Sequence, residues 1–174
     1  MPFPDSFATP RLCAERLTAD HLADLIRMHR DPVQMATLGG VKDDAATAAY
    51  LDRNLAHWTD YGFGLWILRD DAHHVAGRAL LRHLVIDDRD DVEVGYSFHP
   101  EYWGRGLATE IATACVRHGF DDLGLSSIVA ITLPTNLASQ RVLTKAGLVY
   151  ECDVQHGGSA HVLFRTKTSV IGNR

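Results

Sequence analysis

The chain has 174 residues, of which 46% are hydrophobic and 22% are charged, and its formal net charge is −5. We expect one domain over residues 1–174, with a core from about 9 to 168. The acidic balance and the lack of a basic block argue against direct binding of nucleic acid, and the apolar runs are too short to span a membrane. The start, Met1-Pro-Phe-Pro-Asp5, has no signal-peptide pattern, so we expect a cytoplasmic protein.

Three cysteines and ten histidines give no pattern of metal ligands. Cys13, Cys115 and Cys152 lack the paired spacing of a zinc site and the density of a disulfide scaffold, so we interpret them as packing residues. Neither His-Glu-x-x-His nor Cys-x-x-Cys occurs in the sequence. We therefore expect no metal.

Hydrophobic periodicity predicts a strand, two helices and an antiparallel meander in the first part of the chain. Thr18 caps the first helix, Asp31-Pro32 ends it, and Tyr61-Gly62 closes the second. In chain order we expect a strand at 11–17, the first helix, a loop at 33–41, a helix from Asp43-Asp44, and strands at 64–69, 75–86 and 92–98, with polar turns at 70–74 and 87–91.

The second part predicts two helices and three strands. The first helix carries Leu107, Ile111, Cys115 and Phe120 on one side. A strand at 127–133, a helix from Asn136 to Gly147, and strands at 148–154 and 160–166 follow it. The order β-α-α-β-β-β-α-β-α-β-β predicts an α/β (α+β) fold with a mixed sheet.

The segment Tyr102-Trp-Gly-Arg-Gly-Leu-Ala-Thr109 is the most informative part of the chain. Two glycines precede a helix whose first N–H groups lack intrahelical partners and attract an anion. Such glycines also simply cap helices, but here we favour a pyrophosphate-binding turn. The dinucleotide fingerprint and the P-loop are both absent, so phosphate binding of another kind is expected.

Several motifs in the same order resemble the GNAT superfamily of acyl-CoA-dependent N-acetyltransferases. The turn is similar to the family pattern Q/R-x-x-G-x-G/A, although Trp103 departs from its first position. The ribosomal-protein N-terminal acetyltransferase (Rim-type) branch is closer still, although Glu15 replaces the second arginine of its opening motif. The matching segments are Thr9-Pro-Arg11-Leu12, Asp31-Pro32, Glu93-Val-Gly-Tyr96, His99-Pro-Glu-Tyr-Trp-Gly-Arg-Gly106, Asn136-Leu-Ala-Ser139 and Lys145-Ala-Gly147-Leu148.

This resemblance implies the GNAT fold, with a mostly antiparallel mixed sheet splayed between its fourth and fifth strands. It implies acetyl-CoA (coenzyme A) as co-substrate, with pantetheine pairing along the open strand edge. Three of the implied CoA-binding residues have an alternative interpretation. Arg105 is alternatively a solvated surface residue, Thr109 is alternatively a helix cap, and Asn136 is alternatively only an N-cap. The implied CoA-binding residues are Tyr96, Ser97, Phe98, Trp103, Gly104, Arg105, Gly106, Leu107, Ala108, Thr109, Asn136 and Ser139.

The resemblance also implies two catalytic candidates. Glu93 would remove a proton from the amine through water, or it is instead a structural partner for an arginine. Ser139 would protonate or stabilise the leaving thiolate, or it only bonds within its helix. Many family members have a tyrosine at the position of Leu143, so that acid is excluded here. A backbone N–H near Val94 or Gly95 would hold the oxyanion.

The acceptor site is less specified. The resemblance places Met35, Leu38, Trp58 and Tyr61 on its wall, although such residues are often core. The acidic stretch 87–91 either attracts a cationic acceptor or is a solvated turn. We expect acetyl transfer to a primary amine of a protein, a peptide or a small molecule, by a monomer or homodimer. The alternatives are a non-catalytic CoA-binding sensor or interaction domain and transfer of a larger acyl group such as succinyl.

Overall fold

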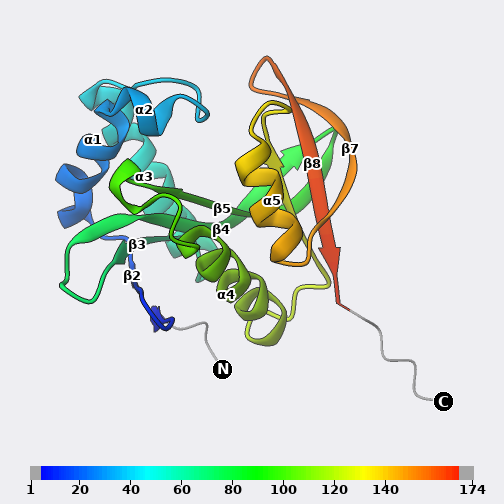
Figure 1. The fold of residues 1–174 in the computed structure, drawn as a ribbon, viewed down its shortest axis with the longest axis horizontal. Coiled ribbons are helices and arrows are strands. Elements are labelled where there is room, and N and C mark those ends of the chain that lie inside the picture. Colours follow the sequence, from blue (N-terminus) through cyan, green and yellow to red (C-terminus); the bar gives the residue numbers. More distant parts are fainter. Residues whose placement is uncertain (1–4, 169–174) are drawn as a thin grey trace.

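The computed structural model describes residues 5–168 and is built on one eight-stranded sheet (Figure 1). The order across the sheet is β1-β2-β3-β4-β5-β6-β8-β7, and every neighbouring pair is antiparallel except β5 with β6. The strands are β1 (Ser6–Ala8), β2 (Cys13–Arg16), β3 (Leu65–Arg69), β4 (Val75–Ile86), β5 (Arg89–Phe98), β6 (Ser127–Thr132), β7 (Val149–His156) and β8 (Ser159–Lys167).

Five α-helices join these strands, and several of them begin or end where the sequence supplies a cap. Asp43 accepts a hydrogen bond from the Ala46 N–H at the start of α3, and Gly62 ends that helix at φ 76°. The helices are α1 (Leu22–Arg30), α2 (Pro32–Met35), α3 (Asp44–Tyr61), α4 (Leu107–Asp121) and α5 (Leu137–Lys145), with short 3-10 turns at Ala19–His21 and Pro100–Tyr102. None of the helices between residues 5 and 168 is long and apolar enough to cross a membrane.

The predicted order of elements and the fold class are confirmed, with two additions. Strand β1 precedes the first predicted strand, and its Phe7 is buried against Trp66. Helix α2 lies inside the predicted loop 33–41, because the Asp31 carboxylate accepts hydrogen bonds from the N–H groups of Val33 and Gln34. Neither element is long enough to show periodicity in the sequence.

The hairpin between β4 and β5 is tighter than predicted. Its turn consists of Asp87 and Asp88 alone, with φ values of 50° and 60°. Such left-handed backbone at two successive residues is typical of two-residue hairpin turns, and aspartate tolerates it. Strand β5 therefore starts at Arg89, three residues before the predicted position, and Asp90 and Asp91 belong to the strand.

The hydrophobic core is unequally divided. The main cluster contains the side chains of β3, where Leu65, Trp66, Ile67 and Leu68 are all fully buried. A smaller cluster joins the end of β4 to β6, β7 and β8 and consists of Leu84, Ile86, Val129, Val154 and Leu163. The two parts of the sheet are thus held together mainly at one end.

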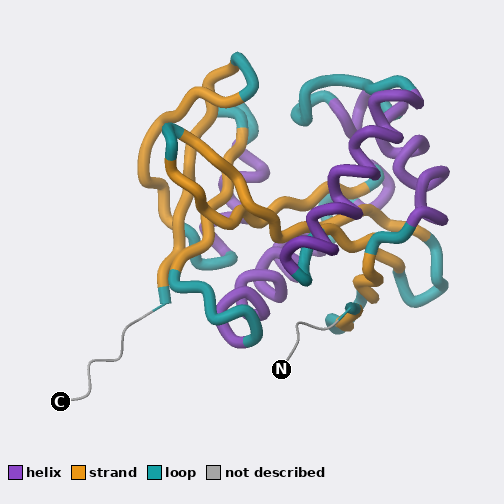
Figure 2. The backbone as a smooth tube through the Cα atoms, turned by 180° about the vertical axis from the view of Figure 1, so that it is seen from behind, coloured by secondary structure: helices purple, strands orange, loops and turns teal. Residues whose placement is uncertain are grey.

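Strands β5 and β6 separate beyond that end. Strand β5 pairs with β4 through ten residue pairs but with β6 only at Glu93 and Val129. Figure 2 shows the strands of the C-terminal half turning away from those of the N-terminal half. The edge of β5 from Val94 to Phe98 therefore has no strand partner on this side. Because β1 was not predicted, β5 and β6 are the fourth and fifth predicted strands, and the predicted splay between them is confirmed.

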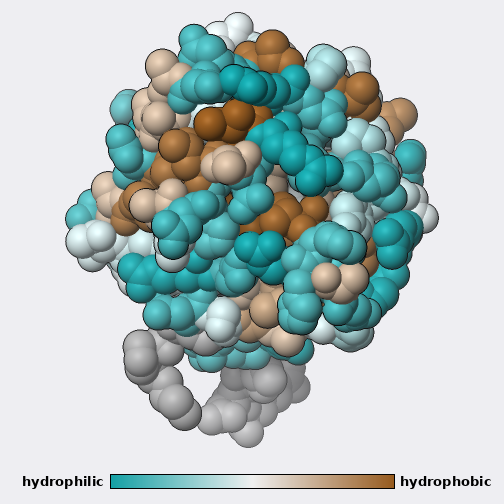
Figure 3. All heavy atoms as spheres, turned by 90° about the vertical axis from the view of Figure 1, so that its left-hand side faces the viewer, coloured by the Kyte–Doolittle hydropathy of each residue, from teal (hydrophilic) through white to brown (hydrophobic). Residues whose placement is uncertain are grey.

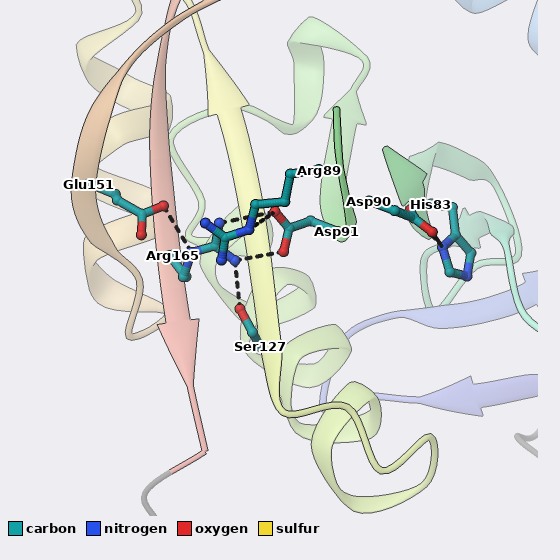
Figure 4. A network of polar contacts seen from close by, with 7 residues as sticks. All are labelled: His83, Arg89, Asp90, Asp91, Ser127, Glu151 and Arg165. Carbon is teal, nitrogen blue, oxygen red and sulfur yellow. Dashed lines mark hydrogen bonds and ion pairs between the residues drawn. The ribbon is translucent and has the colours of Figure 1, made fainter. Parts of the chain in front are cut away.

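Arg165 of β8 fastens the closed end of the splay (Figure 4). Its Nη1 and Nη2 atoms donate to the two Asp91 carboxylate oxygens at 2.7 and 3.0 Å, and Nη1 also donates to Ser127 Oγ at 2.7 Å. Its Nε donates to Glu151 at 2.9 Å. One buried guanidinium thus connects β5, β6, β7 and β8, and its hydrogen bonds lower the pKa of Asp91.

Candidate active site

The glycine turn leaves the start of α4 without a side-chain cap. Gly104 and Gly106 have φ values of 71° and 75°, and Gly106 is the N-cap residue. The first bond of the helical ladder runs from the Glu110 N–H to the Gly106 carbonyl oxygen at 3.1 Å. The N–H groups of Leu107, Ala108 and Thr109 precede that ladder, so they are suited to bind an anion. Thr109 does not act as the helix cap.

Two residues of the N-terminal segment, Thr9 and Arg11, brace this turn. Thr9 Oγ1 and Arg11 Nε donate to the Glu110 carboxylate at 2.6 and 2.7 Å. Arg11 Nη1 also donates to the Arg105 carbonyl oxygen at 2.7 Å. Burial acts to raise the pKa of Glu110, but these bonds together outweigh it and the pKa is lowered. The N-terminal segment therefore fixes the conformation of the turn.

The turn is also tied to the open end of β5. The half-exposed Trp103 donates a hydrogen bond from Nε1 to the Phe98 carbonyl oxygen at 2.9 Å. The guanidinium of Arg105 lies over the Tyr102 ring, 5.3 Å from its centroid, and is exposed. The predicted phosphate turn and the predicted pantetheine edge are thus joined by one side-chain hydrogen bond.

Tyr96 and Ser139 meet across the splay. The Tyr96 and Ser139 hydroxyl oxygens are 3.0 Å apart, and the Tyr96 hydroxyl also donates to the Ser139 carbonyl oxygen at 3.3 Å. Asn136 Oδ1 accepts from the Ser139 N–H at 3.1 Å and caps α5. Burial raises the pKa of Tyr96 to about 12, so its hydroxyl is protonated at neutral pH. The structure thus places a second hydroxyl beside the predicted acid.

Glu93 has an arginine partner. Its carboxylate accepts a hydrogen bond from Arg82 Nε at 2.7 Å, and the glutamate is 6% exposed. The two residues face each other on β5 and β4. Desolvation of the guanidinium lowers the pKa of Arg82, but its interactions with Glu93 and Tyr50 together outweigh this effect and the pKa is raised. The structural role considered for Glu93 therefore has a defined partner, and the same pair positions the carboxylate at the vertex of the splay.

The four residues expected on the acceptor wall divide into two groups. Met35 and Trp58 are 1% and 3% exposed, and Trp58 Nε1 donates to the Leu65 carbonyl oxygen at 2.9 Å. Both are core side chains and offer no surface to an acceptor in this structure. Leu38 is exposed to a greater degree than either, and Tyr61 is exposed and stacks on His83 with ring centroids 4.2 Å apart.

In the acidic stretch 87–91, Asp90 and Asp91 form ion pairs. Asp91 binds Arg165, and Asp90 accepts from His83 Nδ1 at 3.0 Å, on opposite sides of β5 in Figure 4.

Ser97 faces the helices, and its Oγ atom accepts a hydrogen bond from Gln34 Nε2 at 2.8 Å. The face formed by the N-terminal helices is mixed in character, with hydrophobic residues interrupted by hydrophilic ones (Figure 3).

Several of these residue roles cannot be predicted from the sequence. The bracing residues Thr9 and Arg11 are about a hundred positions from Glu110, and no local pattern connects them. The family resemblance places Tyr96 on the strand edge expected to bind CoA but gives its hydroxyl no role. Its position three residues after Glu93 on the unpaired edge is the one available signal.

Comparisons with known proteins agree with this geometry. The family model described as "Acetyltransferase (GNAT) domain" matches residues 11–149. The uncharacterized protein YkkB of Bacillus subtilis is 29% identical over 142 residues, which cover 81% of this chain and 83% of YkkB. The uncharacterized N-acetyltransferase YoaA of the same organism is 39% identical over 69 residues, which cover 40% of this chain and 39% of YoaA.

Solved structures show the same fold. A putative GnaT-family acetyltransferase from Bordetella pertussis superimposes with a TM-score of 0.82 at 23% identity, covering 93% of this chain and 99% of the other. A spermidine N-acetyltransferase from Vibrio cholerae, in complex with CoA and spermine, superimposes with a TM-score of 0.74 at 15% identity, covering 91% and 96%. With the family model matching most of its length, this chain belongs to the GNAT family and is an N-acetyltransferase.

Proposed function

We propose that this protein transfers an acetyl group from acetyl-CoA directly to a primary amine, as a member of the Rim-type branch. The observation that carries the proposal is the continuity between the unpaired β5 edge and the uncapped start of α4. The N–H groups of residues 104–109 would bind the pyrophosphate, and the edge 96–98 would pair with pantetheine. The spermidine N-acetyltransferase with the same fold was solved with CoA, which supports this donor.

The reaction needs a neutral amine, because an alkylammonium has a pKa of about 10 and carries no free electron pair. Glu93 would accept the amine proton through water while Arg82 holds its carboxylate in place. The amine nitrogen then attacks the thioester carbonyl carbon, and a backbone N–H near Val94 or Gly95 would stabilise the oxyanion. The nitrogen of the tetrahedral intermediate loses its second proton to water, and collapse of the intermediate breaks the carbon–sulfur bond.

The thiolate that leaves takes up a proton. Ser139 and Tyr96 would supply it, because their hydroxyls are 3.0 Å apart at the splay and Tyr96 is protonated at neutral pH. The proton finally comes from solvent, and the products are the amide and CoA. Leu38 and Tyr61 would border the acceptor.

Thiol release tests this proposal. We expect CoA formation from acetyl-CoA to accelerate in the presence of an accepted amine, and the product to gain the mass of one acetyl group. The alternative of a CoA-binding module is supported if acetyl-CoA stabilises the fold but no amine or peptide of a panel accelerates the release of CoA. A product with the mass of a succinyl group, formed preferentially from succinyl-CoA, supports the larger donor.

A further inference from the structure

Arg78 of β4 is a buried charge without a counter-ion. Among residues 5–168, the buried arginine and carboxylate residues are Arg78, Glu93 and Arg165. Glu93 is paired with Arg82, and Arg165 is paired with Asp91 and Glu151. Arg78 is 8% exposed and has neither an ion pair nor a side-chain hydrogen bond within the described chain. The Arg78 nitrogens are not among the fully buried unpartnered atoms of the described chain, so an anion can reach them, and a largely buried cation without a counter-ion is suited to bind one.

The surroundings of Arg78 are aromatic, neutral or cationic. Its guanidinium lies 5.3 Å from the centroid of the Tyr50 ring, and Arg53 lies over the same ring at 6.0 Å. His29 is buried beside this ring, at a centroid distance of 4.9 Å. Burial, and then the charges of Arg78 and Lys42, lower the pKa of His29 to about 4, so this histidine is neutral.

Arg78 also lies beside the predicted reaction centre. It faces Ser97 across the β4–β5 ladder, and Ser97 is on the strand whose far edge opens at the splay. The amide of Gln34 donates to Ser97 Oγ, while its Oε1 atom is buried and has no partner in the described part of the chain. A cationic donor and a neutral acceptor are thus both unsatisfied near Ser97.

We propose that Arg78 binds a carboxylate of the acceptor, so that the substrate is a small amine that also carries a carboxylate. This inference rests on the proposed function and names its substrate class. The carboxylate would bind the guanidinium, and Gln34 Oε1 would accept a hydrogen bond from the same molecule. Polycations such as spermine, which the spermidine N-acetyltransferase structure contains, are poorly suited to this site.

Matched acceptors test the proposal with the full-length protein. Thiol release is measured with L-amino acids, β-alanine and 4-aminobutyrate, with the amide of each, and with spermidine. We expect the carboxylates to be preferred over their amides. In Arg78→Met the KM for the carboxylate should rise about tenfold to a hundredfold, as expected for a lost hydrogen bond to a charged group, while the KM for acetyl-CoA is unchanged.

Arg78→Lys retains the charge and should keep part of the preference. Arg30→Met is the matched control, because Arg30 is exposed and pairs with Asp44 on the surface. Equal turnover of acids and amides by the wild type, or an unchanged preference in folded Arg78→Met, overturns the carboxylate site and leaves acetyl transfer intact. Calorimetric titration of the CoA-bound protein separates the two failures. Carboxylate binding that depends on Arg78 without any turnover supports the site and refutes the proposed transfer.

Discussion

The hydroxyl oxygen of Tyr96 lies 3.0 Å from that of Ser139 and joins β5 to α5 across the opening of the sheet. A strand residue and a helix residue about forty positions apart are thereby placed together where the thioester sulfur is expected. We expect Tyr96→Phe and Ser139→Ala each to lower kcat about a hundredfold or more, as is typical for loss of a general acid. The double variant should lose little more than either single variant, because both hydroxyls act on one proton.

Steady-state kinetics with the best acceptor check this prediction. The KM for acetyl-CoA should change little, since the Tyr96→Phe substitution leaves the backbone of the strand edge in place. Independent, fully additive losses in kcat would contradict a shared role for the two hydroxyls.

Substitutions of Glu93 and of Arg82 distinguish a catalytic role of Glu93 from a structural one. Glu93→Gln should lower kcat about a hundredfold or more near neutral pH if the carboxylate accepts the amine proton, and the loss should shrink as the pH approaches about 10, where the free amine is already neutral. Arg82→Met leaves the buried carboxylate without its cation and should destabilise the fold by about 3–5 kcal/mol. Urea denaturation measures the stability change, and pH–rate profiles measure the catalytic change. If Glu93→Gln only destabilises the protein and leaves kcat unchanged, the glutamate is a structural partner of Arg82.

Arg165 should control the stability of the closed end of the splay. Arg165→Met removes the shared partner of Asp91 and Glu151, so we expect a loss of about 3–5 kcal/mol in the free energy of unfolding. Arg89→Met is the control, because Arg89 contacts Asp91 at 3.4 Å but is exposed and should matter much less. Chemical denaturation of both variants gives the comparison, and equal losses would argue against a central role for Arg165.

The pairing of Asp91 with Arg165 predicts a dependence of stability on pH. The folded-state pKa of Asp91 is lowered, so its stabilisation is complete above the unfolded-state value of about 3.9 and is lost as the pH falls through the folded-state value. The difference in urea midpoint between the wild type and Asp91→Asn should therefore be constant near neutral pH and shrink below about pH 4. A difference that stays constant at lower pH would contradict this assignment.

The brace of the glycine turn should affect binding of the donor more than the chemical step. Glu110→Gln weakens the bonds from Thr9 and Arg11, and we expect the KM for acetyl-CoA to rise about tenfold while kcat changes little. Arg117→Gln, an exposed change on the same helix, is the control. A fall in kcat at unchanged KM for acetyl-CoA would show that these bonds support the chemical step rather than donor binding.

The sequence by itself determined the order of elements, the glycine turn and the family. These features are local or repeat with a fixed period, since a glycine turn before an apolar helix and alternating strands need no distant partner. The caps at Asn136 and Gly147 belong to the same class, and the structure confirms both. The short elements β1 and α2 were not predicted, because β1 depends on tertiary packing and α2 on one aspartate cap.

Only the tertiary structure decided which side chains meet. Trp58 packs in the core because α3 carries it to Leu65, and Tyr96 reaches Ser139 because β5 leaves β6 after a single residue pair. Arg82, Arg165 and Arg78 look alike in the sequence, but the fold gives carboxylates to the first two and none to the third. Charge pairing in the interior depends on contacts between distant segments, and these follow from strand register and helix packing rather than from any spacing along the chain.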